Sequence, residues 1–155
     1  MRKTKEAFTW IIGILKEHKI PFQITGGFAA NIYGSNRVLV DIDIGIPDEK
    51  IFEIQNRVKK FIIYGPKRYK DNVFDLLLMT LKYKGQEMDI YGINSEKLFN
   101  KKTNKWNKAR INLSKTTKKK VFNLIVSIIP LKDLISYKKK ISRNVDIQDI
   151  KALSM

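Results

Sequence analysis

Two aspartates stand one residue apart in the segment Asp41-Ile42-Asp43-Ile44, among otherwise apolar neighbours. Residues i and i+2 of a strand project to the same face, so Asp41 and Asp43 would present their carboxylates together. Two like charges at this spacing cost free energy unless a cation holds them. Asp89 is a further acid between apolar strand neighbours, and if its strand lies beside the first, three carboxylates meet at one point.

The donor set indicates which metal such a cluster would bind. The chain has one His and no Cys, and three carboxylates are oxygen donors. Oxygen ligands favour a hard, octahedral cation, so we expect Mg²⁺ or Mn²⁺ rather than zinc at Asp41, Asp43 and Asp89. Two such ions about 3.5–4 Å apart can align an attacking hydroxyl and a leaving pyrophosphate. The alternative is that Asp89 is an ordinary acid on an edge strand.

A glycine pair, Gly26-Gly27, ends the apolar run at residues 22–25 and opens a short helical segment. Backbone N–H groups at such a turn point at an anion, and the helix dipole favours it. A phosphate-binding turn near metal-binding aspartates predicts nucleotide chemistry.

The elements that must position these residues follow from hydrophobic periodicity and from Gly and Pro breakers. We expect a single domain over residues 1–155, of α/β class, with a small mixed β-sheet flanked by helices mainly on one face and the metal site at its edge. The segment 74–84 has no clear period, so a helix is the alternative there. The expected helices are 3–19, 27–33, 47 to about 62, 130–142 and 145–153, and the expected strands are 22–25, 38–46, 74–84, 86–93 and 121–129.

The chain is strongly basic, with 31 Lys and Arg against 15 Asp and Glu and a formal net charge of +16. Such a surplus favours a polyanionic partner, although a biased genome would give the same composition. Residues 97–120 contain ten Lys and Arg and no acid, interleaved with Phe99 and Trp106, which suits a nucleic-acid surface. A flexible, solvated lysine-rich loop is the alternative. The expected nucleic-acid contacts are Lys101, Lys102, Lys105, Trp106, Lys108, Arg110, Lys118, Lys119 and Lys120.

The absence of cysteine fits a cytoplasmic protein. No apolar run approaches the length of a membrane span, and the apolar stretch near the N-terminus reads as an amphipathic helix. We therefore expect no membrane partner.

The chain resembles the polymerase-β-like nucleotidyltransferases. The resemblance lies in Gly26-Gly27, Tyr33-Gly34-Ser35-Asn36-Arg37, Asp41-Ile42-Asp43 and Met88-Asp89-Ile90. The tail, Leu134-Ile135-Ser136-Tyr137-Lys138, then Arg143 and Asp146-Ile147-Gln148-Asp149-Ile150, resembles that of small members: the lincosamide nucleotidyltransferases and the abortive-infection-type toxins.

This resemblance implies roles for individual residues. Asp41, Asp43 and Asp89 would bind the metals, and Gly26, Gly27, Ser35 and Arg37 would bind the nucleotide. Asp149 resembles the tail acid of the toxin branch, which would orient Lys138 or accept a proton.

The position of Lys138 on the expected helix from Pro130 supports a role in the site independently of the resemblance. It follows Leu134 by four residues, so its stem can run along the apolar face while its ammonium reaches the site. A cation there would offset charge on the phosphates. In the alternative, Lys138, Lys139 and Lys140 are a solvated run.

The implied reaction moves a nucleoside monophosphate from an NTP to an acceptor hydroxyl. The basic surplus favours RNA or tRNA as acceptor, as in the toxin branch, where a cognate antitoxin protein is a further expected partner. An antibiotic acceptor, as in the lincosamide branch, is the alternative. Leu39 stands where family members often have Thr or Ser, which leaves open a non-catalytic nucleic-acid-binding protein on a degenerate transferase fold.

Overall fold

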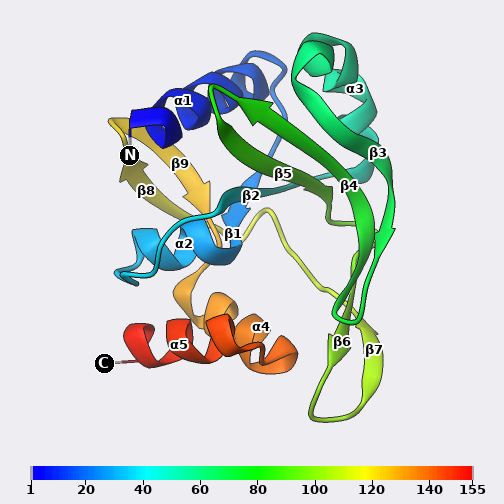
Figure 1. Cartoon of the computed structure of the whole chain (residues 1–155), viewed down its shortest axis with the longest axis vertical. Helices are drawn as coiled ribbons and strands as arrows, with labels where there is room; N and C mark the ends of the chain where they lie inside the picture. Colours follow the sequence, from blue (N-terminus) through cyan, green and yellow to red (C-terminus); the bar gives the residue numbers. More distant parts are fainter. Residues whose placement is uncertain (1, 155) are drawn as a thin grey trace.

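The computed structural model describes residues 2–154, which form one mixed α/β unit (Figure 1). The helices are α1 (Arg2–Glu17), α2 (Gly26–Ile32), α3 (Asp48–Val58), α4 (Leu131–Ile141) and α5 (Asn144–Leu153), with a 3₁₀ turn, η1, at Lys59–Phe61. The strands are β1 (Gln23–Thr25), β2 (Asp41–Ile46), β3 (Ile62–Lys70), β4 (Phe74–Tyr83), β5 (Gln86–Gly92), β6 (Lys97–Asn100), β7 (Lys105–Lys108), β8 (Thr117–Val121) and β9 (Leu124–Ile128).

All described strands belong to one sheet, in the order β7-β6-β4-β5-β2-β1-β9-β8, with β3 also paired to β4. The pairs β2–β5 and β1–β9 are parallel, and the other pairs are antiparallel. The predicted mixed sheet is therefore confirmed. The aspartates lie on β2 and β5 in the middle of the strand order, so the expectation that the metal site lies at the sheet's edge is wrong.

One face of the central strands carries the main hydrophobic core. Alternate residues of β2, β4 and β5 point toward α1 and α3, among them Ile42, Met79 and Ile90, all fully buried. The amphipathic α1 contributes Phe8, Ile11, Ile12 and Leu15 to this core. Helices α1 and α3 lie together above the sheet in Figure 1.

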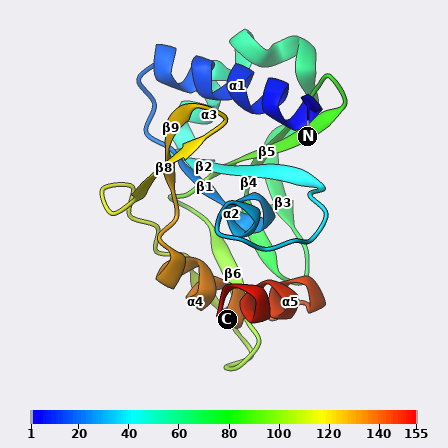
Figure 2. The same ribbon diagram turned by 90° about the vertical axis from the view of Figure 1, so that its left-hand side faces the viewer.

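The opposite face of the same strands points toward α4 and α5, which lie across the molecule from α1 (Figures 1 and 2). On this face Leu76 and Tyr91 form a smaller apolar cluster with Phe74 and Leu78. Because β4 is covered on both faces, its sequence shows no alternation, and this is why a helix stayed open as an alternative. The structure has a strand there.

Two elements differ from the sequence prediction. The helix expected to reach residue 62 ends at Val58, and β3 follows it. Gly65-Pro66 lies in an irregular stretch of β3 where the register to β4 shifts. A Cβ at Gly65 would lie 2.1 Å from the Leu78 carbonyl oxygen, so this close approach requires glycine.

The strand expected at residues 121–129 is the turn and second arm of a hairpin, β8–β9. Phe122 and Asn123 both have positive φ, at 49° and 66°, and reverse the chain there. Positive φ at two central residues is typical of tight hairpin turns, and Asn tolerates it. No helix within residues 2–154 is both long and apolar enough to cross a bilayer.

Candidate active site

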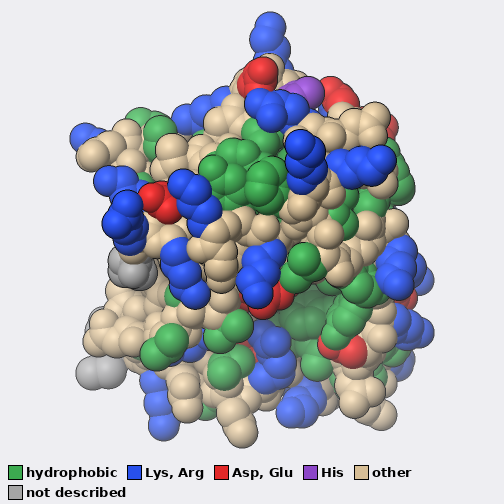
Figure 3. Space-filling model, turned by 45° about the horizontal axis from the view of Figure 1, so that its top comes forward, with side chains coloured by type: hydrophobic (Ala, Val, Ile, Leu, Met, Phe, Trp, Pro, Cys, Tyr) green, Lys and Arg blue, Asp and Glu red, His purple; other side chains and the backbone are tan. Residues whose placement is uncertain are grey.

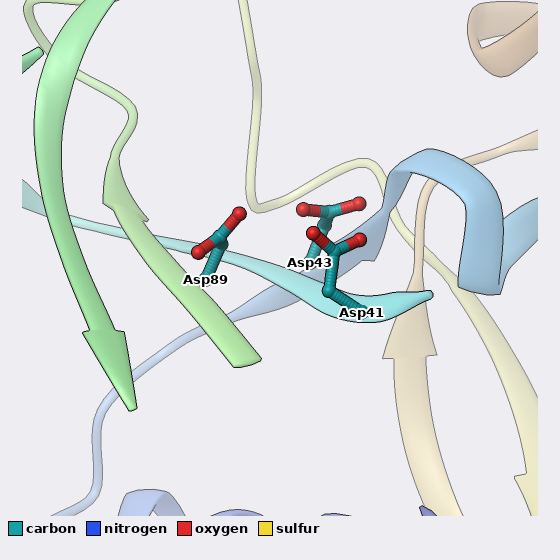
Figure 4. Close-up of side chains that lie close together, drawn as sticks. All are labelled: Asp41, Asp43 and Asp89. Atoms are coloured by element: carbon teal, nitrogen blue, oxygen red, sulfur yellow. The ribbon is translucent and has the colours of Figure 1, made fainter. Parts of the chain in front are cut away.

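The three predicted aspartates meet on one face of two adjacent strands. Parallel pairing of β2 with β5 sets Asp43 directly opposite Asp89, and Asp41 precedes Asp43 on the same face. Carboxylate oxygens of all three lie within 4.8 Å of one another. Figure 4 shows the side chains projecting together from the two strands. The expected convergence of the three carboxylates is therefore confirmed.

All three carboxyl groups of this cluster have a raised pKa. Burial raises the pKa of Asp43 well above its usual range, and the carboxylates of Asp41 and Asp89 raise it further against the opposing charge of Lys138. Burial raises the pKa of Asp89 to about 6, although the hydroxyl of Thr80 donates to its Oδ1 at 2.7 Å and works in the other direction. Burial and the charge of Glu87 also raise the pKa of Asp41. A bound cation would relieve this repulsion.

The glycine turn is in close contact with this cluster. Gly26 has φ +65°, and a Cβ there would lie 2.1 Å from Oδ2 of Asp43. A Cβ on Gly27 would lie 2.2 Å from a terminal nitrogen of Arg37. Both glycines are therefore required by close approach to a site side chain, and the first also by its left-handed backbone.

A cavity of about 280 Å³ opens over the aspartates. Arg37 and Arg143 lie in its wall, so two guanidinium groups face the space next to the three carboxylates. Apolar and aromatic side chains from β3, β4 and α5 complete the enclosure. The lining residues are Thr25, Gly26, Gly27, Arg37, Val40, Asp41, Asp43, Tyr69, Phe74, Leu76, Leu78, Asp89, Tyr91, Glu96, Tyr137, Arg143 and Val145.

Behind this wall lies a buried ion cluster made by α4, α5 and the loop after α2. Lys138 is fully buried and pairs with Asp149 at 2.9 Å and with Asp146 at 3.1 Å. Asp149 also accepts from Nε of Arg37 at 2.9 Å, and Asp146 pairs with Nε of Arg143 at 2.7 Å. The cluster thus anchors both cavity arginines.

This arrangement separates the sequence-predicted site residues into two groups. Gly26, Gly27 and Arg37 line the cavity with the three aspartates. Ser35, Lys138 and Asp149 are buried behind the wall, where the hydroxyl of Ser35 donates to Asp149 at 3.0 Å. Lys138 belongs to an ion cluster and is not part of a solvated run. Leu39 packs against the main core and is not in the cavity wall.

The predicted nucleic-acid residues do not form one continuous surface. Lys101, Lys102, Lys105, Trp106 and Lys108 lie on or near the β6–β7 hairpin, whereas Lys118, Lys119 and Lys120 lie on β8, at the other end of the strand order. Lys119 stacks on the ring of Tyr33, with its Nζ 4.7 Å from the ring centroid. Basic side chains are spread over the face seen in Figure 3 and do not gather into one patch there.

Sequence reasoning missed a second cavity of about 120 Å³ next to the first. Tyr91, Glu96, Tyr137 and Thr25 line both cavities, and Arg110 lies in the wall of the second. Tyr91 had a detectable signal, because it follows Asp89 by two residues on a strand and so shares its face. No such sequence signal marks Glu96, because its burial depends on chain segments that follow it.

Comparison with known proteins points to one fold. No family model matches the sequence, and no curated protein matches it. Among solved structures, a candidate nucleotidyltransferase from Thermotoga maritima is 17% identical with a TM-score of 0.76, over 97% of this chain and 92% of that chain. The lincosamide antibiotic adenylyltransferase LnuA, bound to lincomycin, is 15% identical with a TM-score of 0.63, over 96% and 95%. ANT(2″)-Ia, in complex with adenylyl-2″-tobramycin, is 13% identical with a TM-score of 0.61, over 97% and 87%. The chain therefore shares the fold of these nucleotidyltransferase structures.

Proposed function

We propose that this chain transfers a nucleoside monophosphate from an NTP to an acceptor hydroxyl, with release of pyrophosphate. The observation that carries the proposal is the juxtaposition, in one cavity, of three carboxylates and two guanidinium groups. Carboxylates suit divalent cations, and guanidinium groups suit phosphate oxygens. The nucleotidyltransferase fold supports the same chemistry.

The residues fit a divalent metal. The donors are all oxygen, they converge within 4.8 Å, and burial makes their shared negative charge costly without a cation. Asp41, Asp43 and Asp89 would hold Mg²⁺ or Mn²⁺. When bound, such ions supply charge stabilisation for the phosphates and alignment of the attacking and leaving oxygens.

The acceptor oxygen forms a bond to the α-phosphorus, and the bond from that phosphorus to the oxygen bridging toward the β-phosphate breaks. The electron pair leaves with pyrophosphate, and the hydroxyl proton goes to the carboxylate of Asp89. Without a bound metal, burial raises the pKa of this carboxylate to about 6, so it is mostly ionised at neutral pH and can accept a proton. Thr80 donates to its Oδ1 and fixes its orientation.

Arg37 and Arg143 would hold the triphosphate next to the turn at Gly26 and Gly27. Asp149 and Asp146 fix these two guanidinium groups, and Lys138 bridges the two acids. We assign Lys138, Asp149 and Ser35 as positioning residues. A group held in place by buried partners loses less entropy when substrate binds.

The cavity over the aspartates favours a small hydroxylated acceptor. Its wall contains a buried acid and several aromatic side chains, which suits a compact molecule better than a long polyanion. LnuA and ANT(2″)-Ia, which share the fold, are described with small antibiotics.

RNA or tRNA is the second candidate acceptor, favoured by the net charge of +16 and by the β6–β7 hairpin. Nζ of Lys70, at the end of β3, lies 5.1 Å from the ring centroid of Trp106 on this hairpin, so an aromatic ring lies among cations. The proposal of an RNA acceptor includes a toxin role, an antitoxin partner and a cytoplasmic location. A non-catalytic RNA-binding protein would differ from both, because Asp41→Asn would then leave its binding and cellular effect unchanged.

The test incubates the protein with Mg²⁺ or Mn²⁺ and NTPs labelled at the α-phosphate, with total RNA in one arm and a set of hydroxylated small molecules in the other. We expect label on an acceptor with wild type and at least a hundredfold less with Asp43→Asn. Glu49→Gln, the same loss of one charge on the exposed start of α3, should match wild type. Label only on RNA would exclude the small-molecule version, and label in neither arm would contradict the enzyme.

A further inference from the structure

Glu96 is a buried acid that the proposed transfer step does not use. It lies between β5 and β6, is 2% exposed, and lines both the aspartate cavity and its smaller neighbour. Its Oε1 has no hydrogen-bond partner within residues 2–154. A buried carboxyl oxygen without a partner destabilises the fold, so such a group is usually retained for a structural or functional reason.

The backbone around Glu96 is firmly held. Asp48 and Asn94 exchange two hydrogen bonds, in which each backbone N–H donates to the other residue's side-chain oxygen, at 2.8 and 2.9 Å. Arg68 donates to the hydroxyl and the carbonyl of Ser95 at 2.8 and 2.7 Å. The carbonyl of Glu96 itself accepts from Ala109 N at 2.8 Å. The backbone at Glu96 is therefore held on both sides, which fixes the place from which its side chain enters the two cavities.

No basic residue compensates the charge. None of the ion pairs formed among residues 2–154 includes Glu96. Burial and the nearby charge of Asp48 raise its pKa to about 8. Arg110 and Lys140 lie in the wall of the smaller cavity, but both are exposed to water. The carboxyl thus has an unused capacity for a cationic partner.

The surroundings of Glu96 suit an ammonium group. Tyr91 and Tyr137 line the same two cavities, and burial together with the nearby charge of Glu96 raises the pKa of both phenols. A carboxylate beside aromatic rings binds a desolvated ammonium through charge and through the ring faces. Asp89 lines the same cavity, so one small molecule can present an ammonium to Glu96 and a hydroxyl to the transfer site.

We infer that Glu96 recognises a positively charged amine on a small acceptor whose hydroxyl receives the nucleotide, an inference that rests on the proposed transferase function. Glu96 is then the residue that selects amine-bearing acceptors over neutral polyols. A charge-assisted hydrogen bond of this kind corresponds to about tenfold in affinity or more.

The test uses two probes of matched shape, trans-4-aminocyclohexanol and trans-1,4-cyclohexanediol, which differ in one amine. Their dissociation constants are measured by ligand-observed NMR on the full chain at pH 9, where Glu96 is ionised and the amine of the probe is still an ammonium ion. We expect wild type to prefer the amino alcohol by about tenfold. Glu96→Gln, which keeps shape and removes charge, should abolish the preference, whereas Glu49→Gln on exposed α3 should retain it.

Thermal unfolding checks that Glu96→Gln is folded, and it should be at least as stable as wild type because it removes a buried, unpaired acid. Binding of MgATP to wild type reports separately on the transferase proposal. Equal binding of the two probes, no binding of either, or a preference that survives Glu96→Gln would each overturn the inference. If wild type keeps the amine preference but binds no MgATP, the amine site stands and the proposed transferase function fails.

Discussion

Gly26 offers a sharp test of the active-site geometry, through substitution by alanine. The added Cβ would lie 2.1 Å from Oδ2 of Asp43, whereas ordinary contact begins at 3.4 Å. The carboxylate must therefore retreat by about 1.3 Å or turn away from Asp41 and Asp89. The φ of +65° adds about 1–2 kcal/mol of backbone strain for a residue with a side chain.

The displacement of the Asp43 carboxylate and the backbone strain at residue 26 affect different measured quantities. We expect Mn²⁺ affinity to fall at least tenfold, since displaced metal ligands typically cost 10–100-fold. A displacement of about 1 Å at the reacting centre should also lower kcat/KM by about a hundredfold. Strain alone should lower Tm by roughly 2–8 °C in a chain of this size. Mn²⁺ titration by calorimetry, nucleotide transfer and thermal unfolding measure the three quantities.

Gly34→Ala is the matched control. Gly34 also has positive φ, at +121°, but a Cβ there meets nothing within 4 Å. It should lose stability while Mn²⁺ affinity per folded molecule stays at the wild-type value. Unchanged Mn²⁺ binding in Gly26→Ala, or equal losses in both variants, would refute the contact between the turn and Asp43.

Three further outcomes follow from the buried charges and from α1. Lys138→Met leaves Asp146 and Asp149 buried without their shared cation, so it should lower the free energy of unfolding by about 3–5 kcal/mol. Urea titration measures this value, and a loss below about 1 kcal/mol would contradict the ion cluster. Without metal, stability should fall as pH rises from 5 to 8, because the raised pKa values of Asp43, Asp89 and Glu96 favour the folded state only while these groups are protonated. Saturating Mn²⁺ should flatten the aspartate part of that slope in Tm measurements, and a metal-independent profile would count against metal binding by the cluster. Gly13→Ala, on the exposed side of α1, should raise the free energy of unfolding by about 0.5–1 kcal/mol without altering transfer, and a loss of stability would show that α1 needs glycine there.

The sequence allowed the three aspartates to be predicted together because each signal is local. The i, i+2 spacing of Asp41 and Asp43 fixes a shared face, and the apolar neighbours of Asp89 mark a strand. Only the adjacency of the strands that carry these aspartates had to be assumed, and the observed pairing of β2 with β5 confirms it. The glycine turn was also predictable, although the reason for it, contact with Asp43 and Arg37, is visible only in three dimensions.

The missed features depend on long-range contacts. The sequence predicts a helix that continues to about residue 62, whereas the helix ends at Val58 and residues 62–70 form a strand by pairing with β4. Lys138 was predicted to reach the site from a helix face, with a solvated lysine run as the alternative. Its burial in an ion cluster requires Asp146 and Asp149 from the next helix. Glu96 is buried by β6, α4 and the segment near Ala109, none of which its own neighbours in sequence reveal.

The two faces of the central strands have different roles: one packs in the core and the other lines the cavity. Ile42, Met79 and Ile90 face α1 and hold the fold together, while Leu76, Leu78 and Tyr91 face the space above the aspartates. Replacements on the second face can therefore change the shape of the cavity, while the packing against α1 on the first face stays as it is. The architecture thus separates the residues that determine folding from those that determine what the cavity can hold.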